Sequence, residues 1–565
     1  MKKYLPILIV LIFGLLAGRT LFTPGYFNMH DDLQMMRQLE MEKCFLDGQI
    51  PCRWVPDMGY GYGFPLFNFY PPLPYLIGEI FRVVGFSFID TAKFTFALSF
   101  VVSGITMYLL AKEFFGKAGG VVSSIFYVWA PYHSVDVYVR GAMNEAWALA
   151  FFPLIFLFSY KLIKTGKGII PLAFAYAGLL MSHNLMVMIF TPLFGLWCLI
   201  FILRENKWKI ISRLLASGVL ALGLAAFFTI PAVVEQKLVR VDTLIVGYYE
   251  YIAHFASLNQ LLFSRFWGYG PSIWGDNDGM PFPAGNIHWI VSIVVGVASV
   301  YFLFKLKKKK EILKSPYFII LFFILSGWFA LFMAHSRSTP IWQAIKPLEF
   351  VQFPWRFLTI VTLSFSFIAG SMVLLMRPFG RLRVIVPSLL AILLVAINWN
   401  YFLPLGGKMG ELTDEEKFNS AAWDLQRTAG IYDYLPKSAV ENPKDGQNVL
   451  AEIIEGNAEL SEMKQGTDWA SFRVRVKDTP GTIRVNIFAF PNWKAFRSGQ
   501  EIQTYVNAEE RWGRMYIDIP QGSHDIYLKL FNTPIRTLSN IISVITWFLL
   551  LTFPIWRKKI NAVQV

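Results

Sequence analysis

The chain has 565 residues, of which 55% are hydrophobic and only 16% are charged, whereas a soluble protein has roughly 25% charged residues. This composition excludes an ordinary soluble enzyme and indicates an integral membrane protein with a smaller soluble part. The net charge is +14, but the basic residues lie in short loops between apolar runs. That placement is typical of membrane orientation signals and argues against nucleic acid as a partner.

The first apolar run, 4–22, follows a basic start at Met1-Lys2-Lys3, an arrangement that signal peptides also have. The run is long, however, and Ala17-Gly18-Arg19 is a poor match to the small residues of a cleavage site. We therefore expect an uncleaved first span.

Further runs of similar length follow along the chain. A helix needs roughly twenty apolar residues to cross the hydrocarbon core of a bilayer. Such runs lie near 4–22, 91–111, 118–133, 146–162, 168–184, 186–203, 210–231, 287–304, 317–334, 357–376, 384–403 and 535–555. The sequence therefore predicts an α-helical polytopic membrane protein with about twelve spans.

The loops between these runs alternate in charge. One set is rich in Lys and Arg and comprises 2–3, 112–117, 161–167, 204–213, 305–314, 377–383 and 557–559. The positive-inside rule places this set, and with it both termini, in the cytoplasm. The other set is then extracytoplasmic and comprises 23–90, 134–145, 232–286, 335–356 and 404–534. We expect a multi-pass protein of the inner (cytoplasmic) membrane of the cell.

This alternation requires that residues 73–88 do not form a full span. The segment is apolar but carries Glu79 and Arg82, and counting it as a span would put the lysines of 112–117 on the wrong side. We expect juxtamembrane or re-entrant short helices there.

The segment 404–534 differs in kind from the rest. After a short helical stretch near 411–435, residues alternate with period two, as in Phe472-Arg473-Val474-Arg475-Val476, and turn signals such as Thr479-Pro480-Gly481 separate the runs. This pattern predicts a small antiparallel β-sandwich. The expected parts are therefore a transmembrane domain at 1–403 with its first outer loop at 23–90, an extracytoplasmic mainly-β domain at 404–534, and a final span with a basic cytoplasmic tail at 535–565.

An acidic pair, Asp31 and Asp32, follows His30 about ten residues after the first run. A carboxylate partly withdrawn from water has a raised pKa, which suits a general base, and a second carboxylate raises one pKa of the pair further. His30 would orient one carboxylate or accept the proton itself. A cap at the start of the following helix also explains Asp32, and the two roles are compatible.

An aromatic loop, Gly59-Tyr60-Gly61-Tyr62-Gly63 and onward to Pro72, follows in the same outer segment. Tyr60, Tyr62 and Tyr70 are candidates for walls on which a sugar stacks.

Two cysteines, Cys44 and Cys52, lie eight positions apart in the same segment. An oxidising compartment would permit a bridge that stabilises by roughly 2–3 kcal/mol. The sequence leaves the bridged and the free forms equally open.

Asp136, Arg140 and Asn144 are spaced four residues apart, with Glu145 adjacent. If the stretch is helical they share one face. A plain ion pair explains the spacing, and so does an arginine whose bidentate fork is presented to a phosphate.

Two other polar motifs border the spans. Arg356 stands among aromatic residues in Gln352-Phe353-Pro354-Trp355-Arg356-Phe357, where it either snorkels to the headgroups or binds a lipid phosphate. His183-Asn184 interrupts an apolar hairpin and is either a satisfied polar pair between helices or a contact to substrate.

The side of the membrane limits the chemistry. Because nucleotide-activated donors are cytoplasmic, a transferase that acts outside needs a donor carried across on a lipid, and a polyprenyl-phosphate sugar has the required phosphate leaving group. A base near the membrane would deprotonate an acceptor hydroxyl, and an arginine would balance the charge on the departing phosphate.

The chain also resembles known membrane proteins. The motifs that carry the resemblance are His30-Asp31, Trp54-Val55-Pro56-Asp57 with its Gly-Tyr loop, Tyr138-Val139-Arg140-Gly141-Ala142, Ser182-His183-Asn184 and 352–357. They are similar to those of the 6-pyruvoyl-tetrahydropterin synthase-related membrane proteins, and the layout resembles the C-type glycosyltransferase (GT-C) superfamily. The resemblance implies a GT-C-like fold at 1–403 with an aspartate of the first outer loop as the base, and some members of that superfamily need a divalent metal. The clustered histidines of the soluble pterin synthases are not found in this sequence.

The sequence thus predicts an inverting GT-C-type glycosyltransferase that moves a sugar from a polyprenyl-phosphate carrier to a glycan, lipid or protein acceptor. The candidate site has Asp31 as base, Asp32 as metal ligand or partner, and Arg140 and Arg356 as phosphate contacts. The remaining candidates for substrate binding are Glu145, His183 and Asn184. A divalent cation is possible, and its ligands stay open. The alternatives are a non-catalytic protein of glycan or lipid assembly and, less favoured, a transporter.

Overall fold

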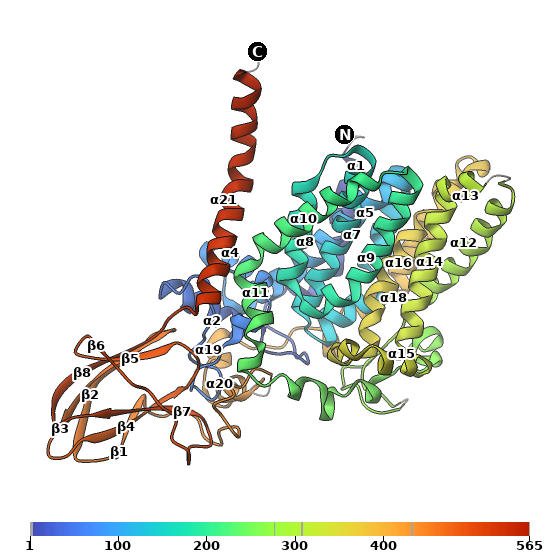
Figure 1. The fold of residues 1–565 in the computed structure, drawn as a ribbon. Helices are drawn as coiled ribbons and strands as arrows, with labels where there is room; N and C mark the ends of the chain where they lie inside the picture. The colour runs from blue at the N-terminus through green and yellow to red at the C-terminus, as the bar shows by residue number, and fades with distance from the viewer. Residues whose placement is uncertain (1–3, 276, 307–308, 431–432, 564–565) are drawn as a thin grey trace. The chain divides into compact units, whose positions relative to one another are not determined.

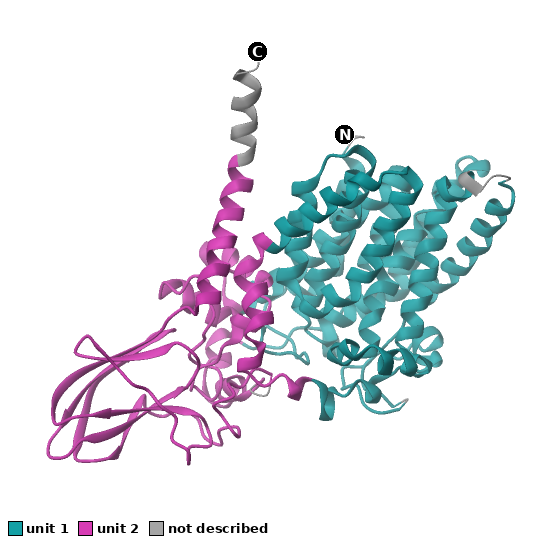
Figure 2. Ribbon diagram, viewed as in Figure 1, with its two compact units in different colours: residues 1–34, 89–222, 245–412 teal, residues 35–88, 223–244, 413–565 magenta. Residues whose placement is uncertain are grey.

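The computed structural model describes residues 4–275, 277–306, 309–430 and 433–563 and divides the chain into two compact units (Figures 1 and 2). Unit 1 comprises residues 1–34, 89–222 and 245–412, and unit 2 comprises residues 35–88, 223–244 and 413–565. The basic start at 1–3 and the side chains of the basic tail at 557–559 lie outside the described residues.

Unit 1 is a bundle of helices. Its longer helices are α1 (Leu5–Ala17), α5 (Phe88–Val128), α7 (Met143–Thr165), α8 (Ile169–Ser182), α9 (Asn184–Glu205), α10 (Ile211–Leu224), α12 (Asn286–Phe304), α14 (Pro316–Met333), α16 (Leu358–Ala369) and α18 (Leu382–Asn398). Its shorter helices are α6 (Pro131–Ser134), α13 (Lys309–Lys314), α15 (Thr339–Ala344) and α17 (Met372–Leu375), and a π-helical turn spans Val135–Val139.

Among the described residues, 8 helices are long and apolar enough to cross a membrane, or up to 9 if the bent pair Trp208–Leu224 and Ala226–Val234 is one span. Two shorter apolar helices, α1 and α8, match the predicted runs at 4–22 and 168–184. The polytopic helical architecture is confirmed, whereas the count of about twelve spans remains a prediction.

Two of the predicted spans form the single long element α5. At Gly116 the backbone leaves the helical region (φ 75°, ψ −178°). Beyond it the chain folds back, because the Ser124 hydroxyl donates to the Gly104 carbonyl at 2.7 Å and a Cβ at Gly120 would meet the Tyr108 ring at 2.9 Å. Residues 88–115 and 117–128 therefore lie side by side in opposite directions and form a helical hairpin, as the predicted spans at 91–111 and 118–133 with the short loop between them require.

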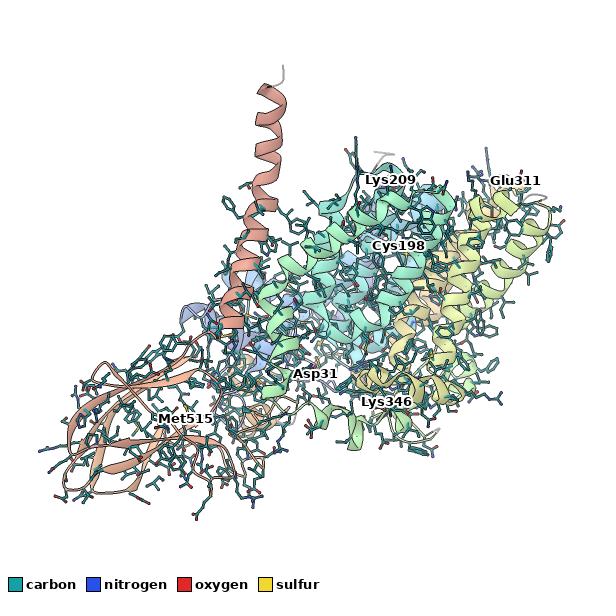
Figure 3. All side chains as sticks on the ribbon, in the orientation of Figure 1. Asp31, Cys198, Lys209, Glu311, Lys346 and Met515 are labelled. Atoms are coloured by element: carbon teal, nitrogen blue, oxygen red, sulfur yellow. A yellow bond between two sulfur atoms is a disulfide. The ribbon has the colours of Figure 1, made fainter. Side chains whose placement is uncertain are left out.

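Four of the predicted cytoplasmic loops meet at one end of unit 1, which we call the basic end. The contacts are Lys161 Nζ to Glu113 Oε1 at 3.3 Å, Lys207 Nζ to the Ile163 carbonyl at 3.2 Å, and Arg204 Nη1 to the Ser315 carbonyl at 3.4 Å. Figure 3 shows Lys209 and Glu311 at this end and Asp31 and Lys346 at the opposite end of the same unit. The charge alternation along the sequence thus becomes a separation between the two ends of unit 1.

Within the described part of the chain, unit 2 combines short helices, the C-terminal helix and strands β1 to β8. Its helices are α2 (Gln34–Leu46), α3 (Leu66–Phe69), α4 (Leu73–Val84), α11 (Ala226–Val234), α19 (Asp414–Lys417), α20 (Ser420–Thr428) and α21 (Pro534–Val563). Its strands are β1 (Ala451–Glu455), β2 (Ala458–Gln465), β3 (Trp469–Val476), β4 (Gly481–Phe488), β5 (Trp493–Arg497), β6 (Gln500–Ile502), β7 (Arg514–Ile519) and β8 (Gly522–Leu530).

The strands form the predicted antiparallel β-sandwich (Figure 1). One sheet has the order β1-β4-β7 and the other has the order β2-β3-β8-β5-β6. In β3, Phe472 and Val474 are buried while Arg473 and Arg475 are exposed, because successive side chains of a strand point to opposite faces. The alternating runs of the sequence therefore identified both the strands and their inner faces.

Helix α4 occupies most of the apolar segment 73–88. Its 12 residues extend about 18 Å, which is short of the roughly 30 Å of a hydrocarbon core. Glu79 is buried and accepts a hydrogen bond from Gln38 Nε2 at 2.5 Å, while Ile80 and Val83 are exposed. The length of α4 and the burial of Glu79 agree with the expectation that this segment is not a full span, which stays a prediction.

A buried network explains why the first outer loop packs with the C-terminal part of the chain. Glu235 accepts hydrogen bonds from Asn68 Nδ2 at 2.9 Å and from Arg536 Nε at 2.8 Å. Arg53 donates to Asn68 Oδ1 at 3.0 Å and to Asn540 Oδ1 at 2.7 Å. Segments far apart in the sequence are thus joined within unit 2.

Each compact unit is built from three separate stretches of the chain, whereas the predicted domains were consecutive stretches.

The hairpin turn gives the first prediction. A Cβ at Gly116 meets no atom within 4 Å, so Gly116→Ala tests backbone conformation alone. We expect it to destabilise by about 1–3 kcal/mol, because only glycine adopts this φ and ψ without strain. Thermal unfolding of the detergent-solubilised protein measures the change. Gly195→Ala is the matched control, since Gly195 lies in α9 with equally open space and no positive φ, and it should be neutral or slightly stabilising. Equal effects of the two substitutions would contradict the prediction.

Candidate functional site

The backbone brings the predicted base next to a predicted phosphate ligand. The His30 amide donates to the Val139 carbonyl at 3.1 Å, and the Asp31 amide donates to the Arg140 carbonyl at 2.9 Å. Both segments belong to unit 1. Residues from the first outer loop and from the loop before α7 are therefore neighbours.

Gln34 and Gly141 hold the segments of Asp31 and Arg140 close together. Gln34 Nε2 donates to Asp31 Oδ2 at 3.1 Å and to the Gly141 carbonyl at 2.7 Å. Gly141 has φ +63°, and a Cβ there would lie 2.2 Å from Met29 Sδ. The glycine in the Arg140-Gly141 motif is thus required by close packing as well as by conformation.

The three predicted catalytic residues lie at the surface of unit 1 or partly below it. Asp31 and Asp32 are half-buried and His30 is exposed. His30 Nε2 lies 3.0 Å from the Tyr269 carbonyl. Both aspartates are therefore partly exposed, although Asp32 Oδ1 itself is buried, and Figure 3 shows Asp31 at the end of unit 1 opposite the basic end.

Arg140 is the centre of a buried charged cluster. Its Nη1 donates to Asp136 Oδ1 at 2.5 Å, to Glu145 Oε2 at 2.8 Å and to the Tyr132 hydroxyl at 3.2 Å. The guanidinium lies over the Trp355 ring, 4.6 Å from its centroid. A buried charge is tolerated only when it is paired and hydrogen-bonded, and an arginine provides a flat face for stacking as well as several donors.

Arg356 joins the same cluster. Its Nη1 donates to the Val351 carbonyl at 2.8 Å and to Gln352 Oε1 at 2.9 Å, and its Nε lies 3.6 Å from Glu145 Oε2. Arg356 is only 9% exposed, so the structure contradicts the snorkelling interpretation. Gln352 has φ +66°, an uncommon conformation for a residue with a side chain, and its bond to Arg356 holds the turn.

The helical face predicted for Asp136, Arg140 and Asn144 is interrupted. The π-helical turn ends at Val139 and α7 begins at Met143. Asp136 and Arg140 form the simple ion pair that the spacing also allowed, whereas Asn144 Nδ2 donates to the Ser182 carbonyl at 2.8 Å. Because the helix is interrupted after Val139, the Arg140 side chain is directed toward Glu145 and joins the charged cluster.

His183 and Asn184 have local roles in the structure. His183 Nδ1 accepts from the Leu185 amide at 3.2 Å and caps the start of α9. Asn184 is exposed. A contact of either residue to substrate stays a prediction.

The predicted tyrosine walls belong to unit 2. Tyr62 is 3% exposed and packs against Phe488 and Trp512, with ring centroids 5.6 and 6.1 Å away. It is a core residue here and not an open wall, because both neighbouring rings come from the β-domain region and cover it. Tyr60 and Tyr70 are half-buried, and the Arg37 guanidinium lies 4.3 Å from the Tyr70 ring centroid.

The first outer loop also contains a disulfide and a second group of charged residues, Glu40, Lys43 and Asp57. Cys44 and Cys52 form a disulfide, which resolves the alternative that the sequence left open. Glu40 is fully buried, and its burial together with nearby Asp57 raises the pKa of its carboxyl well above the usual range. Lys43 pairs with Asp57. Sequence reasoning missed this trio, although Asp57 belongs to a motif that it had singled out.

Within the described residues, no group of three or more His, Cys, Asp or Glu side chains could hold a metal ion.

An open hollow of about 520 Å³ lies beside Gln260, Asp278 and Phe282. None of the predicted site residues lines it, but Phe282 stacks on Trp355 with centroids 5.6 Å apart, so it adjoins the charged cluster.

The burial of the cluster gives the second prediction. Arg140→Met would leave the carboxylates of Asp136 and Glu145 buried without their main partner, which should destabilise by about 3–5 kcal/mol. Thermal unfolding in detergent measures the loss. The matched control is Lys346→Met, which breaks the exposed pair with Glu349 and should change little. If both substitutions have the same small effect, the cluster is not a significant stabilising element.

Part of the chain matches the model of a known protein family. Residues 67–275 match the model of the 6-pyruvoyl-tetrahydropterin synthase related domain, which is described as a membrane protein. An uncharacterized protein of Lactococcus lactis subsp. cremoris (strain MG1363) is 24% identical over 250 residues, which are 42% of this chain and 41% of that protein. The match thus spans less than half the length of this relative.

Two solved structures are also similar in outline. The arabinofuranosyltransferase AftD from Mycobacteria is 12% identical, with a TM-score of 0.40 over 72% of this chain and 27% of that one. The oligosaccharyltransferase of Archaeoglobus fulgidus is 13% identical, with a TM-score of 0.34 over 71% and 55% of the two chains. The resemblance to the 6-pyruvoyl-tetrahydropterin synthase-related membrane proteins that the motifs predicted is confirmed over residues 67–275, which match the model of that domain.

Proposed function

We propose that this protein is a GT-C-like membrane glycosyltransferase that transfers a sugar from a polyprenyl-phosphate carrier to an extracytoplasmic acceptor. The observation that carries the proposal is the pairing of the Asp31 and Arg140 backbones, which brings the segment of the half-buried Asp31 next to the segment that supplies one of the two clustered arginines. A base and a cationic group close together are what a displacement at a sugar phosphate requires.

The orientation of unit 1 supports a lipid-linked donor. The basic loops meet at one end of the unit and Asp31 lies at the other. By the positive-inside rule the basic end faces the cytoplasm. Asp31 then faces the extracytoplasmic side, where nucleotide-activated sugars are absent and a donor must arrive on a lipid.

The reaction follows from these groups. The Asp31 carboxylate takes the proton of an acceptor hydroxyl, whose oxygen attacks the anomeric carbon of the donor. The bond between that carbon and the phosphate oxygen breaks, and the polyprenyl phosphate leaves with the bonding electrons. Attack from the side opposite the leaving group inverts the anomeric centre.

The arginines would balance the charge of the leaving phosphate. Arg140 donates to Asp136, Glu145 and Tyr132 from its Nη1 alone, so its Nε and Nη2 take no part in these three bonds. Asp32 is the candidate for a second carboxylate or a cation ligand, and His30 for orienting the pair. A divalent cation is compatible with these oxygen ligands.

A second function is favoured by one specific observation. Asp136 and Glu145 already neutralise Arg140, and Glu145 also lies near Arg356, so the cluster has a purely structural explanation. A non-catalytic protein that handles lipid-linked glycans would have the same architecture. A transporter is less favoured, because the polar groups gather at one end of unit 1 instead of along a path through it.

Asp31→Asn tests catalysis directly. We expect transfer to fall by about 10²–10⁴-fold, because the amide cannot accept the proton. The measurement is the surface glycan profile of cells that express only the variant, with the amount of protein in the membrane checked in parallel.

Asp90→Asn is the matched control for this experiment. Asp90 lies in the same predicted outer loop, is partly exposed and pairs with Lys93, so its variant should retain the glycan. Normal glycan with Asp31→Asn would favour the non-catalytic alternative, and a loss with both variants would point to folding instead of chemistry.

The orientation has its own test. Asn28 is exposed near the acidic pair, and Lys209 lies at the basic end. In intact cells a membrane-impermeant maleimide should label Asn28→Cys and leave Lys209→Cys unlabelled until the membrane is permeabilised. The native cysteines should not interfere, since Cys44 and Cys52 are bridged and Cys198 is buried. The reverse labelling pattern would exclude a carrier-lipid mechanism.

A further inference from the structure

The outer face of the five-stranded sheet carries a strip of aromatic rings. The strip consists of Trp469 in β3, Tyr527 in β8, Phe496 in β5 and Phe531 just after β8. The ring centroids are 6.4 Å apart from Trp469 to Tyr527, 6.5 Å from Tyr527 to Phe496 and 6.0 Å from Phe496 to Phe531. We call these four residues the ring strip.

The ring strip is not needed to fill the core of the sandwich. Phe496 and Tyr527 are direct partners across β5 and β8, and the residues that alternate with Tyr527, namely Ile526 and Leu528, are buried on the inner face. Tyr527 is 41% exposed and Phe531 is 42% exposed. Trp469 and Phe496 are half-buried. A row of large aromatic side chains that is partly open to solvent indicates a surface that contacts something.

The charges beside the ring strip are largely paired with each other. Arg473 Nε lies 2.9 Å from Asp525 Oδ1, and Lys494 Nζ lies 3.0 Å from Glu501 Oε2. The face therefore offers hydrogen-bond donors and acceptors with little net charge around the rings. Such a surface is complementary to an uncharged ligand that has both apolar and hydroxyl-rich sides.

One ring of the strip is held in place by the first outer loop. Asp47 Oδ1 accepts from Trp469 Nε1 at 2.9 Å, while Asp47 Oδ2 accepts from the Thr467 amide at 2.7 Å and from its hydroxyl at 2.8 Å. All three residues belong to unit 2. The Trp469 ring is therefore oriented before any ligand arrives, which lowers the entropy cost of binding.

We propose that the ring strip binds a neutral carbohydrate chain. The C–H faces of successive sugars would stack on the rings, and their hydroxyls would bond to the paired charges at the edges. Because the strip extends over three ring-to-ring steps, it fits a chain of several sugars better than a monosaccharide. The choice of ligand rests on the proposed function, but binding and transfer can fail separately.

The test uses the purified full-length protein on a printed array of neutral and acidic oligosaccharides of increasing length, followed by calorimetry with the strongest ligand. We expect binding to neutral chains, with affinity rising with length. Tyr527→Leu removes the flat ring but keeps an apolar side chain, and it should weaken binding by about tenfold, whereas Tyr527→Phe should stay within about twofold. Tyr505→Ala, at an aromatic residue that pairs with Tyr516 of the other sheet, is the matched control and should bind normally.

Several outcomes would overturn the inference. They are the absence of array binding by folded protein, equal affinity of Tyr527→Leu and the unmodified chain, and a preference for acidic chains. A further measurement tests whether the ring strip contacts a membrane surface instead of a carbohydrate. A fluorophore is attached at Tyr527→Cys in nanodiscs that contain brominated lipid, and quenching of its fluorescence would also overturn the inference. Array binding that persists in Asp31→Asn supports the ring strip whatever happens to transfer, so the two proposals are distinguishable.

Discussion

The cost of burying charge away from water is the constraint on which the rest of this structure depends. Arg140 and Arg356 are buried in unit 1, and the carboxylates of Asp136 and Glu145 are buried with them. Two positive and two negative groups offset each other, and hydrogen bonds satisfy part of the remaining polar surface. The helix is interrupted between Val139 and Met143, and this interruption allows the charged groups to meet. The same non-helical residues include Arg140, whose carbonyl accepts the Asp31 amide.

Unit 2 obeys the same rule with different residues. Glu235 is bonded to Arg536, and Arg53 completes the set through Asn68 and Asn540. These bonds join the first outer loop, α11 and the start of α21, which are widely separated in sequence. Polar networks of this kind are favourable only when their members are satisfied together, so the loop, α11 and α21 depend on one another for their stability.

The sequence allowed the local features to be predicted and left the long-range ones open. The apolar runs and the alternation at 472–476 identified helices and strands because their periodicity reflects burial. The proximity of Asp31 and Arg140 depends on how distant segments pack, and no local pattern contains that information. Tyr62 shows the limit most clearly: its Gly-rich surroundings indicated an open loop, yet the ring is covered by Phe488 and Trp512. Glu40 was missed because a lone glutamate in an amphipathic helix is usually solvated.

The reversal at Gly116 has a consequence for how the protein enters the membrane. The second arm of the hairpin, 117–128, is about 18 Å long as a helix, and α6 and the π-helical turn at Val135–Val139 continue the chain beyond it. The arm packs against residues 88–115 along its length. We therefore expect the two arms to enter the lipid as one helical hairpin, with the turn at Gly116 leaving the two arms free to pair.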